Sequence, residues 1–420
     1  MKIAITSAVY YPMTNGIATF AHNLALGLAN KGHEVMVICP SFTGKSHQVK
    51  RHGVTTVYLK SIRIPFYPDQ INKVPDKKEI LGKDLPRLAY RYGLWVSPNP
   101  YLSVRRALKK FKPDVIHSQT SEMIGQAALT YAERHHIPIV ATGHTYPDTV
   151  TGQFKLLKPI KRPVDAALVK YMARYLKHSD YATMPTEIAI TDLTPKNKRR
   201  FKVPIEALSN GVDLSSFKPG KANIKTYLKY RLPTDRPIVL YVGRIDPEKS
   251  VSLVLEAFAK LLENVSEALL VVVGEGTDRE HLEDYAKYLG IDKNIKFLGR
   301  ILPPTITDIY RAGSLFVTAS EIETQGIVLI EAAATGLPLV AVDAGAVSEI
   351  CHNNKNGYLC QPKDVDGIYE GMKKILKDKD RQHRFSQNSL KFAKEHDLNN
   401  TIGRFEEIYQ TVIDSKNSSS

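Results

Sequence analysis

Short apolar runs alternate with amphipathic segments along this chain, and that alternation constrains its fold more than any other feature. In the first half we expect strands and helices to alternate at Lys2–Tyr10, Gly16–Lys31, His33–Cys39, Tyr101–Phe111, Val115–His117, Met123–His135 and Pro138–Thr142. Strands that alternate with helices in this way indicate a parallel sheet with crossover helices.

The second half repeats the pattern. The expected elements are Pro237–Tyr241, Val251–Leu262, Leu269–Val273, Glu280–Leu289, Ile295–Leu298, Pro304–Ala312, Leu315–Thr318 and Leu339–Val342. We therefore predict two tandem doubly wound α/β domains, residues 1–195 and 205–390, with a last helix at about 396–415 that packs back on the first domain. Ligands of such sheets bind beyond the carboxyl ends of the strands, so the predicted site is a central cleft that both domains face.

Two glutamates eight positions apart, Glu323 and Glu331, flank the start of an apolar helix in the second half. Glu323 lies in a polar, Gly-containing loop, and Glu331 lies about one turn inside the helix, which closes at Thr335-Gly336-Leu337-Pro338. Carboxylates accept hydrogen bonds from sugar hydroxyls, and helix N-termini bind phosphates. The pair favours a ligand that carries both groups; the alternative is a solvated loop before an ordinary core helix.

Two cations follow the first strand of the second half. Gly243 permits a sharp turn at the strand end, and Arg244 and Lys249 then stand near the same helix entrance. A planar guanidinium and a point charge together suit a diphosphate, although both side chains could equally be surface cations. Gly274 and Arg300 also follow strands and are candidates for contact with a nucleotide.

The first half offers three further candidates. Gly16 joins the first strand to the first helix and could present backbone N–H groups to a phosphate, but the full G-x-G-x-x-G pattern is absent, which argues against a nicotinamide cofactor. His144 follows a strand and could donate to a substrate hydroxyl, and Asp148 could orient it or take a proton. A structural role for His144 is the alternative, and His117 at another strand end is a weaker candidate.

Positive charge is concentrated in the first half. Residues 1–200 contain 30 Lys and Arg against 13 Asp and Glu, whereas the rest of the chain is close to balanced. This asymmetry predicts a polyanionic partner, either nucleic acid or an anionic membrane. No nucleic-acid-binding motif is present and the aromatic residues of this half form no stacking pattern, so we expect no nucleic-acid partner.

The segment Lys155–His178 combines a basic and an apolar stripe. Lys170, Arg174 and Lys177 form the basic stripe. The apolar stripe consists of Val164, Ala167, Leu168, Tyr171 and Tyr175. Such a helix could lie on anionic lipid, or it could be a core helix with a solvated basic face.

The composition limits the location of the protein. No apolar run is long enough for a membrane span, the N-terminus does not read as a signal peptide, and the three cysteines lack metal or redox spacing. These features predict a cytoplasmic protein that meets the inner face of the cell membrane peripherally.

Together these motifs resemble the retaining glycosyltransferase family four, which has the GT-B fold, over nearly the whole chain. The residues that carry the resemblance are Gly16, His144-Thr145, Asn210-Gly-Val-Asp213, Gly243-Arg244 with Lys249, and Glu323 with Glu331 and Gly336-Leu-Pro338. The resemblance implies an α/β GT-B fold whose C-terminal domain binds a nucleotide-sugar, with no cofactor.

The resemblance also implies roles for the residues of the second half. Arg244 and Lys249 would hold the diphosphate, and Glu331 would accept from the ribose hydroxyls. Glu323 would contact the donor sugar near its C3 hydroxyl, with the backbone of Gln325–Ile327, which includes Gly326, beside it.

The resemblance further implies that His144 lies by the donor sugar. Two positions depart from the family pattern. The first loop usually reads Gly-Gly and here reads Asn15-Gly16, which keeps the backbone donor of Gly16. The first carboxylate motif often reads Glu-x-Phe-Gly and here reads Glu-Thr-Gln-Gly326, a variant similar to that of bacterial diacylglycerol glucosyltransferases.

The implied reaction is hexose transfer with retention from a nucleotide-diphosphate sugar, with UDP-glucose as the expected donor. The implied acceptor is a lipid such as diacylglycerol, and the alternative is a soluble sugar or a cell-wall polysaccharide precursor. No Asp-x-Asp motif stands where a donor diphosphate would need a metal, so metal-independent catalysis is predicted.

Overall fold

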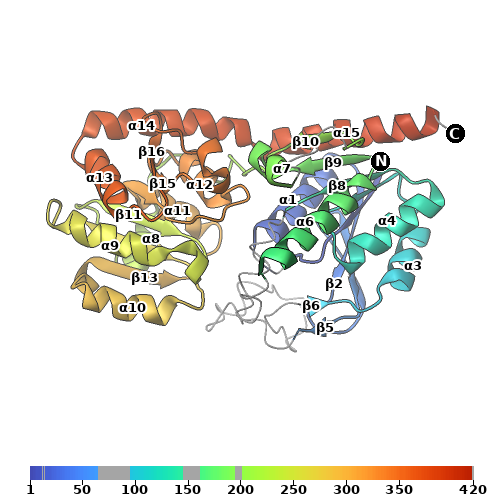
Figure 1. Ribbon diagram of the computed structural model, residues 1–420, viewed down its shortest axis with the longest axis horizontal. Helices are drawn as coiled ribbons and strands as arrows, with labels where there is room; N and C mark the ends of the chain where they lie inside the picture. Colours follow the sequence, from blue (N-terminus) through green and yellow to red (C-terminus); the bar gives the residue numbers. More distant parts are fainter. Residues whose placement is uncertain (12, 14, 65–94, 145–160, 194–200, 419–420) are drawn as a thin grey trace. The chain divides into compact units, whose positions relative to one another are not determined.

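The computed structural model describes residues 1–11, 13, 15–64, 95–144, 161–193 and 201–418. It consists of two compact units, each of which has its own sheet (Figure 1). The first unit contains the described residues up to Asn210 together with the last helix of the chain, and Gly211–Asp397 form the second. Across the described helices, none is both long and apolar enough to cross a membrane.

The first unit is built on an eight-stranded sheet with the order β10-β9-β8-β7-β1-β2-β4-β3. Its strands are β1 (Lys2–Thr6), β2 (Glu34–Pro40), β3 (His47–Arg51), β4 (Val54–Leu59), β7 (Val115–Ser118), β8 (Ile139–Thr142), β9 (Tyr181–Met184) and β10 (Ile205–Ala207). All neighbours are parallel except β3 and β4, which form an antiparallel edge. A separate two-stranded pair joins β5 (Ile62–Arg63) and β6 (Trp95–Val96).

Helices cover both faces of this sheet. They are α1 (Gly16–Asn30), α3 (Tyr101–Phe111), α4 (Met123–His135), α6 (Lys161–Lys177), α7 (Glu187–Leu193) and α15 (Leu398–Ser418). Apolar residues of α1 and α15, including Phe20 and Phe405, pack in one core cluster, and those of α3, α4, α6 and α7 pack in the other. Both faces are therefore buried, which explains why the central strands β1, β2, β7 and β8 are buried at nearly every residue rather than at alternate ones.

The last helix, α15, belongs to the first unit although it follows the second in sequence (red in Figure 1). Its own buried side chains, such as Phe405 and Tyr409, pack into the core of the first unit. Arg404 donates to both carboxylate oxygens of Glu206, and Glu406 pairs with Lys31 at 2.5 Å. The helix thus completes the cover of the sheet.

The second unit has a six-stranded, all-parallel sheet with the order β13-β12-β11-β14-β15-β16. Its strands are β11 (Ile238–Val242), β12 (Leu269–Val273), β13 (Ile295–Gly299), β14 (Leu315–Val317), β15 (Leu339–Val342) and β16 (Gly357–Cys360). Its helices are α8 (Ile224–Tyr230), α9 (Val251–Leu262), α10 (Arg279–Tyr288), α11 (Thr305–Ala312), α12 (Ile327–Ala334), α13 (Val365–Leu376) and α14 (Lys379–Ala393). Short 3₁₀ turns are η3 (Pro247–Lys249), η4 (Asp292–Asn294), η5 (Gly345–Glu349) and η6 (Lys394–His396).

The strand order of this sheet reverses between β11 and β14. From β11 the chain continues to β12 and β13 on one side, whereas β14, β15 and β16 extend to the other. The loops that follow β11 and β14 therefore diverge at one point of the carboxyl edge. In doubly wound sheets such a point is where a crevice for ligands opens.

The predicted α/β class and its parallel sheets are confirmed, but the interpretation of α6 is corrected. The apolar side that faces the core is formed by Val169, Met172, Ala173, Tyr175 and Leu176. Of the predicted apolar stripe, Ala167 and Tyr171 are exposed instead, since the helix is rotated so that its inner face lies about a quarter turn away. The basic face with Lys170, Arg174 and Lys177 is exposed, as either interpretation required.

Candidate functional site

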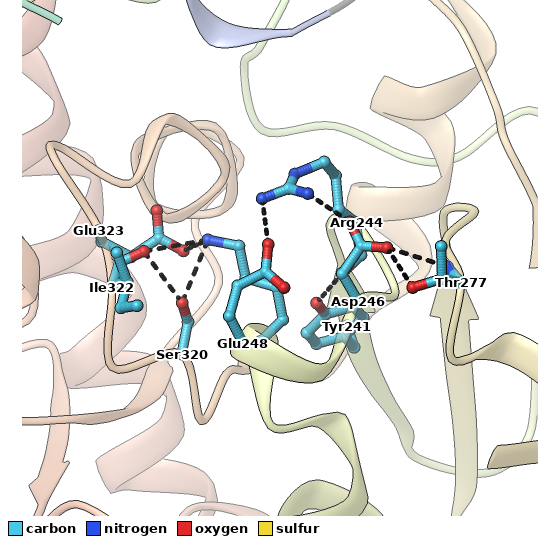
Figure 2. A network of polar contacts seen from close by, with 9 residues as sticks. Tyr241, Arg244, Asp246, Glu248, Thr277, Ser320, Ile322 and Glu323 are labelled. Carbon is cyan, nitrogen blue, oxygen red and sulfur yellow. Dashed lines mark hydrogen bonds and ion pairs between the residues drawn. The ribbon is translucent and has the colours of Figure 1, made fainter. Parts of the chain in front are cut away.

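An ion pair joins the two loops that diverge at the carboxyl edge of the second sheet. Lys249, at the end of η3 after β11, lies 2.7 Å from the Oε1 atom of Glu323, in the loop after β14. Figure 2 shows Ser320, Ile322 and Glu323 together on this loop, and each of them offers an oxygen atom that Lys249 contacts. Both charged side chains are largely buried, at 13% and 17% exposure, so water screens the pair only partly.

Lys249 also organises the backbone of the Glu323 loop. Its Nζ atom donates to the carbonyl oxygen of Ile322 at 3.1 Å and to the Oγ atom of Ser320 at 3.2 Å. The three hydrogens of the ammonium thus have three acceptors, all on one loop. In addition, the N–H group of Ala346, in η5, donates to the carbonyl oxygen of Glu323 at 3.0 Å. Hydrogen bonds therefore hold the backbone on both sides of the Glu323 side chain, which is the predicted catalytic carboxylate.

Arg244 is held by two carboxylates of its own loop. Its guanidinium forms ion pairs with Asp246 and, at 2.6 Å, with Glu248 (Figure 2). Asp246 in turn accepts from the backbone N–H and the hydroxyl of Thr277, at 2.9 and 3.0 Å. The loops after β11 and β12 are thereby joined, and the guanidinium stays fixed near the sheet edge.

A glycine allows these two loops to pass each other closely. Gly274 has φ of +144°, and a Cβ atom there would lie 1.8 Å from the carbonyl oxygen of Gly243. No side chain can occupy that position without moving the backbone. Gly274 thus has a structural role at the sheet edge, which the expectation of nucleotide contact did not include. Arg300 follows β13 and is half-buried at the same edge.

Helix α12 begins at this edge directly after the Glu323 loop. Gly326 is its N-cap residue, with φ of +77°, and Ile327 is its first residue. Gln325 is buried at 2% exposure, so it packs into the unit and its side chain contributes little surface. The helix begins and ends where the sequence predicted, with Thr335 at the C-cap.

Glu331 lies one turn inside α12 and does not join the Glu323 ion pair. Its Oε2 atom accepts a hydrogen bond of 2.7 Å from the hydroxyl of Tyr310, in α11. Burial raises the pKa of Glu331 to about 7, and the hydrogen bond from Tyr310 offsets only part of that effect. The second predicted carboxylate is therefore poised between its two protonation states at neutral pH.

In the first unit, His144 lies at the end of β8 within a buried polar chain. Its Nε2 atom is 2.6 Å from the Oε1 atom of Gln119, and its ring contacts Phe20 of α1 edge-on at 5.2 Å. Burial lowers the pKa of His144 to about 3, so the ring is neutral. Since Nε2–H donates to Gln119, the acceptor side of the ring is Nδ1. In this tautomer Nδ1 carries no hydrogen, so a donation to a substrate hydroxyl from Nε2 would have to replace the bond to Gln119.

A series of buried hydrogen bonds continues from Gln119 to the last helix, α15. The amide of Gln119 lies 3.2 Å from the Nε2 atom of His117, whose Nδ1 atom is 2.6 Å from the hydroxyl of Tyr409 in α15. The same His117 Nε2 atom is 2.7 Å from the Oγ1 atom of Thr142. Burial lowers the pKa of His117 to about 3, and the nearby His144 contributes a smaller part of that effect. His117 is therefore a neutral residue with a structural role in this series of hydrogen bonds.

The remaining candidates of the first unit are placed as follows. Gly16 is the first residue of α1, and the side chain of Asn15 caps the helix by accepting from the N–H of Ala18 at 2.8 Å. The Asn-Gly departure from the family pattern thus supplies its own cap. Asp148 lies outside the described residues.

The structure adds partners that sequence reasoning missed, namely Asp246, Glu248, Ser320, Tyr310, Gln119 and Tyr409. Asp246 and Glu248 had a visible signal, because carboxylates two and four residues after Arg244 are within its reach. Tyr310 and Tyr409 had none, since each comes from a distant element.

A hollow of about 430 Å³ in the second unit lies elsewhere, at the amino-terminal edge of the sheet. Its lining includes Arg236, Asn264 and Lys377 and none of the predicted site residues. The arrangement that can bind a charged, hydroxylated ligand is at the opposite edge, where cations, carboxylates and a helix start come together.

Two family models match the chain. The model described as Glycosyltransferase Family 4 matches residues 14–216, and that described as Glycosyl transferases group 1 matches residues 226–392. Between them they cover most of both units.

Individual proteins are similar over most of their length. The alpha-monoglucosyldiacylglycerol synthase of Streptococcus pneumoniae is 29% identical over 350 residues, which is 81% of this chain and 71% of that protein. The glycogen synthase of Mycobacterium tuberculosis is 26% identical over 395 residues, 90% of this chain and 86% of its own. Among solved structures, Anabaena HepE in complex with UDP-glucose aligns with a TM-score of 0.71 at 16% identity, over 98% of this chain and 100% of that chain.

Proposed function

We propose that this chain, which belongs to glycosyltransferase family four and has its GT-B fold, transfers a hexose from a nucleotide-diphosphate sugar to a lipid acceptor such as diacylglycerol at a membrane surface. The family and the fold expected from the motifs are thus confirmed. Donor, acceptor and stereochemistry are the proposal, with UDP-glucose as the donor.

The observation that carries the proposal is the Lys249–Glu323 ion pair at the point where the strand order of the second sheet reverses. A carboxylate of the kind that accepts from sugar hydroxyls here lies next to a cation of the kind that pairs with phosphate, at the edge where such sheets bind ligands. Arg244 lies in the same loop as Lys249, and α12 begins directly after the Glu323 loop. One helical turn further, Glu331 can accept from the ribose hydroxyls.

The proposed chemistry breaks the bond between the anomeric carbon and the diphosphate oxygen and forms a bond from that carbon to the acceptor oxygen. The acceptor approaches from the face that the diphosphate leaves, which retains the configuration, and its proton passes to the departing diphosphate. Arg244 and Lys249 stabilise the charge that develops on the diphosphate. No metal takes part in this proposal, and the step needs only these side chains.

Glu323 and His144 position the sugar in this proposal. The carboxylate of Glu323 accepts from a sugar hydroxyl near C3, and the backbone of Gln325–Ile327 lies beside it. His144 stays neutral because its pKa is about 3, so it acts by accepting a hydrogen bond at Nδ1 rather than by transferring a proton.

The lipid acceptor is supported by the charge of the first half and by one relative. That half carries 30 Lys and Arg against 13 Asp and Glu, which favours an anionic surface. The name of the S. pneumoniae relative includes diacylglycerol. The M. tuberculosis glycogen synthase favours the alternative, a soluble sugar or polysaccharide acceptor. Asp148, outside the described residues, stays a proposed acceptor contact.

A donor screen tests the reaction. Nucleotide-sugars are offered with diacylglycerol in mixed micelles or with a soluble oligosaccharide, and the stereochemistry of the product is determined. We expect turnover with diacylglycerol and retention. Glu323→Gln should lose turnover while it still binds the nucleoside diphosphate, whereas Glu321→Gln in the same loop should retain both. An active Glu323→Gln enzyme, or an inverted product, would refute the proposed site.

A vesicle assay tests the membrane surface. The protein should sediment with anionic vesicles at low salt and dissociate at high salt. Changing Lys170, Arg174 and Lys177 together to Glu should weaken this binding. A control that changes three exposed lysines of the second unit, Lys377, Lys379 and Lys391, alters the net charge equally. If the two triple variants bind equally, α6 has no specific role at the membrane.

A further inference from the structure

The short helix α8 of the second unit carries two of its most exposed aliphatic side chains. Ile224 is 62% exposed and Leu228 is 71% exposed. They are four residues apart, so they lie on the same face of the helix. Protruding aliphatic pairs of this kind are uncommon away from contact surfaces, because exposed large apolar side chains are usually scattered.

The opposite face of α8 is firmly attached to the unit. Tyr227 and Tyr230 pack against the core, and the hydroxyl of Thr226 donates to Asp308 of α11 at 3.1 Å. Asn223 caps the first turn through the N–H of Lys225 at 2.9 Å. At the other end the ammonium of Lys296 donates to the carbonyl oxygen of Arg231. The outward direction of Ile224 and Leu228 is therefore set by packing.

Positive charge surrounds this aliphatic pair. Residues 218–236 contain six Lys and Arg and one acidic residue, Asp235, whereas residues 211–397 as a whole have 25 Lys and Arg against 26 Asp and Glu. Lys225 and Lys229 lie on the exposed side of α8, next to the two aliphatics. Burial, followed by repulsion from Arg236 and Arg231, lowers the pKa of Lys296, which agrees with a positive potential at this surface.

We propose that the outward face of α8, formed by Ile224, Leu228, Lys225 and Lys229, is a second membrane contact and binds an anionic lipid bilayer. The aliphatic side chains enter the boundary between headgroups and acyl chains, and the lysines pair with lipid phosphates above them. The charge decides for a lipid surface, because the interior of a protein interface is depleted in lysine. The inference rests on the proposed lipid acceptor and extends membrane contact to the donor-binding unit.

Tryptophan fluorescence in the full chain tests this contact. In a Trp95→Phe background, Leu228→Trp is compared with Tyr288→Trp, a position on α10 of the same unit that is 84% exposed. The probe is a vesicle of phosphatidylglycerol and phosphatidylcholine with brominated acyl chains. We expect quenching and a blue shift for Leu228→Trp and neither for Tyr288→Trp. Adding Lys225→Glu and Lys229→Glu should weaken vesicle binding by about 25-fold, at roughly fivefold for each of the two lysines lost.

The outcomes separate this inference from the proposed function. If the chain sediments with the vesicles but Leu228→Trp is not quenched, the α8 contact is refuted and the lipid acceptor survives. If the chain does not bind the vesicles at all, both are refuted. A blue shift of Leu228→Trp without vesicles that grows with protein concentration would assign this face to self-association and overturn the membrane contact.

Discussion

Replacing Glu331 by Gln should stabilise the second unit at alkaline pH and have much less effect at acidic pH. The carboxyl group belongs to a residue of α12, and burial raises its pKa to about 7 from its ordinary value of 4.5. A raised pKa means that the folded protein holds this proton more tightly than the unfolded chain does. Ionised Glu331 is therefore a cost to folding, which begins near pH 4.5 and is complete above pH 7.

The size of this cost follows from the two pKa values. At about 1.4 kcal/mol for each tenfold change, the difference corresponds to roughly 3 kcal/mol for a fully buried group. Glu331 keeps part of its exposure, so we expect about 2 kcal/mol between pH 5 and pH 8. Gln retains an oxygen that can accept from the hydroxyl of Tyr310, so the variant loses the charge and keeps the hydrogen bond.

Urea unfolding followed by circular dichroism at a series of pH values measures the effect as the difference in unfolding free energy between variant and wild type. Glu280→Gln, an exposed glutamate of α10, is the matched control and should show no such trend. If the difference in unfolding free energy between Glu331→Gln and wild type stays constant from pH 5 to pH 8, the pKa of Glu331 is not raised in the folded protein and the reasoning is refuted.

Two further changes test the packing of each unit. Tyr409→Phe should lower kcat by roughly two- to tenfold, the value of one hydrogen bond, because it removes the bond from α15 to His117 and so the support of His144. Nucleotide affinity measured by calorimetry should not change. A lower Tm with unchanged kcat would indicate a purely structural role. Gly274→Ala should destabilise the second unit by more than about 2 kcal/mol in thermal unfolding. Gly290→Ala, also at positive φ but with open space around it, should cost about 1 kcal/mol. Equal losses would contradict the close approach of Gly274 to the backbone of Gly243.

Many of the helices and the central strands were predictable because each has a strong local signal, whereas α7, α8, α13 and α14 were not predicted. The bounds of α3, α4 and α9 agree with the sequence analysis residue for residue, since amphipathic spacing and flanking turn residues mark both ends. The antiparallel edge strand β3 and the edge strand β16 were not predicted. Edge strands are short and partly polar, and their pairing depends on neighbours that local sequence does not reveal.

The site was predictable in its residue types but not in its pairing. Glu323 and Lys249 are 74 positions apart, and only the adjacency of β11 and β14 brings them together. Sequence analysis assigned both cations to a diphosphate and did not foresee that each already has carboxylate partners. The rotation of α6 was missed because apolar residues lie on more than one side of this helix: Ala167 and Tyr171 are exposed, whereas Val169 and Met172 pack against the core.

The ion pairs at the sheet edge make a last prediction about how donor binding proceeds. A diphosphate that reaches Lys249 must compete with the carboxylate of Glu323, which lies 2.7 Å from the ammonium. Displacement would release that carboxylate for a sugar hydroxyl, so donor binding and the availability of Glu323 are coupled. Glu323→Gln removes the competing charge and should bind UDP at least as tightly as wild type in calorimetry, although turnover is lost. Weaker UDP binding would show that Glu323 holds Lys249 in place for the diphosphate rather than competing with it.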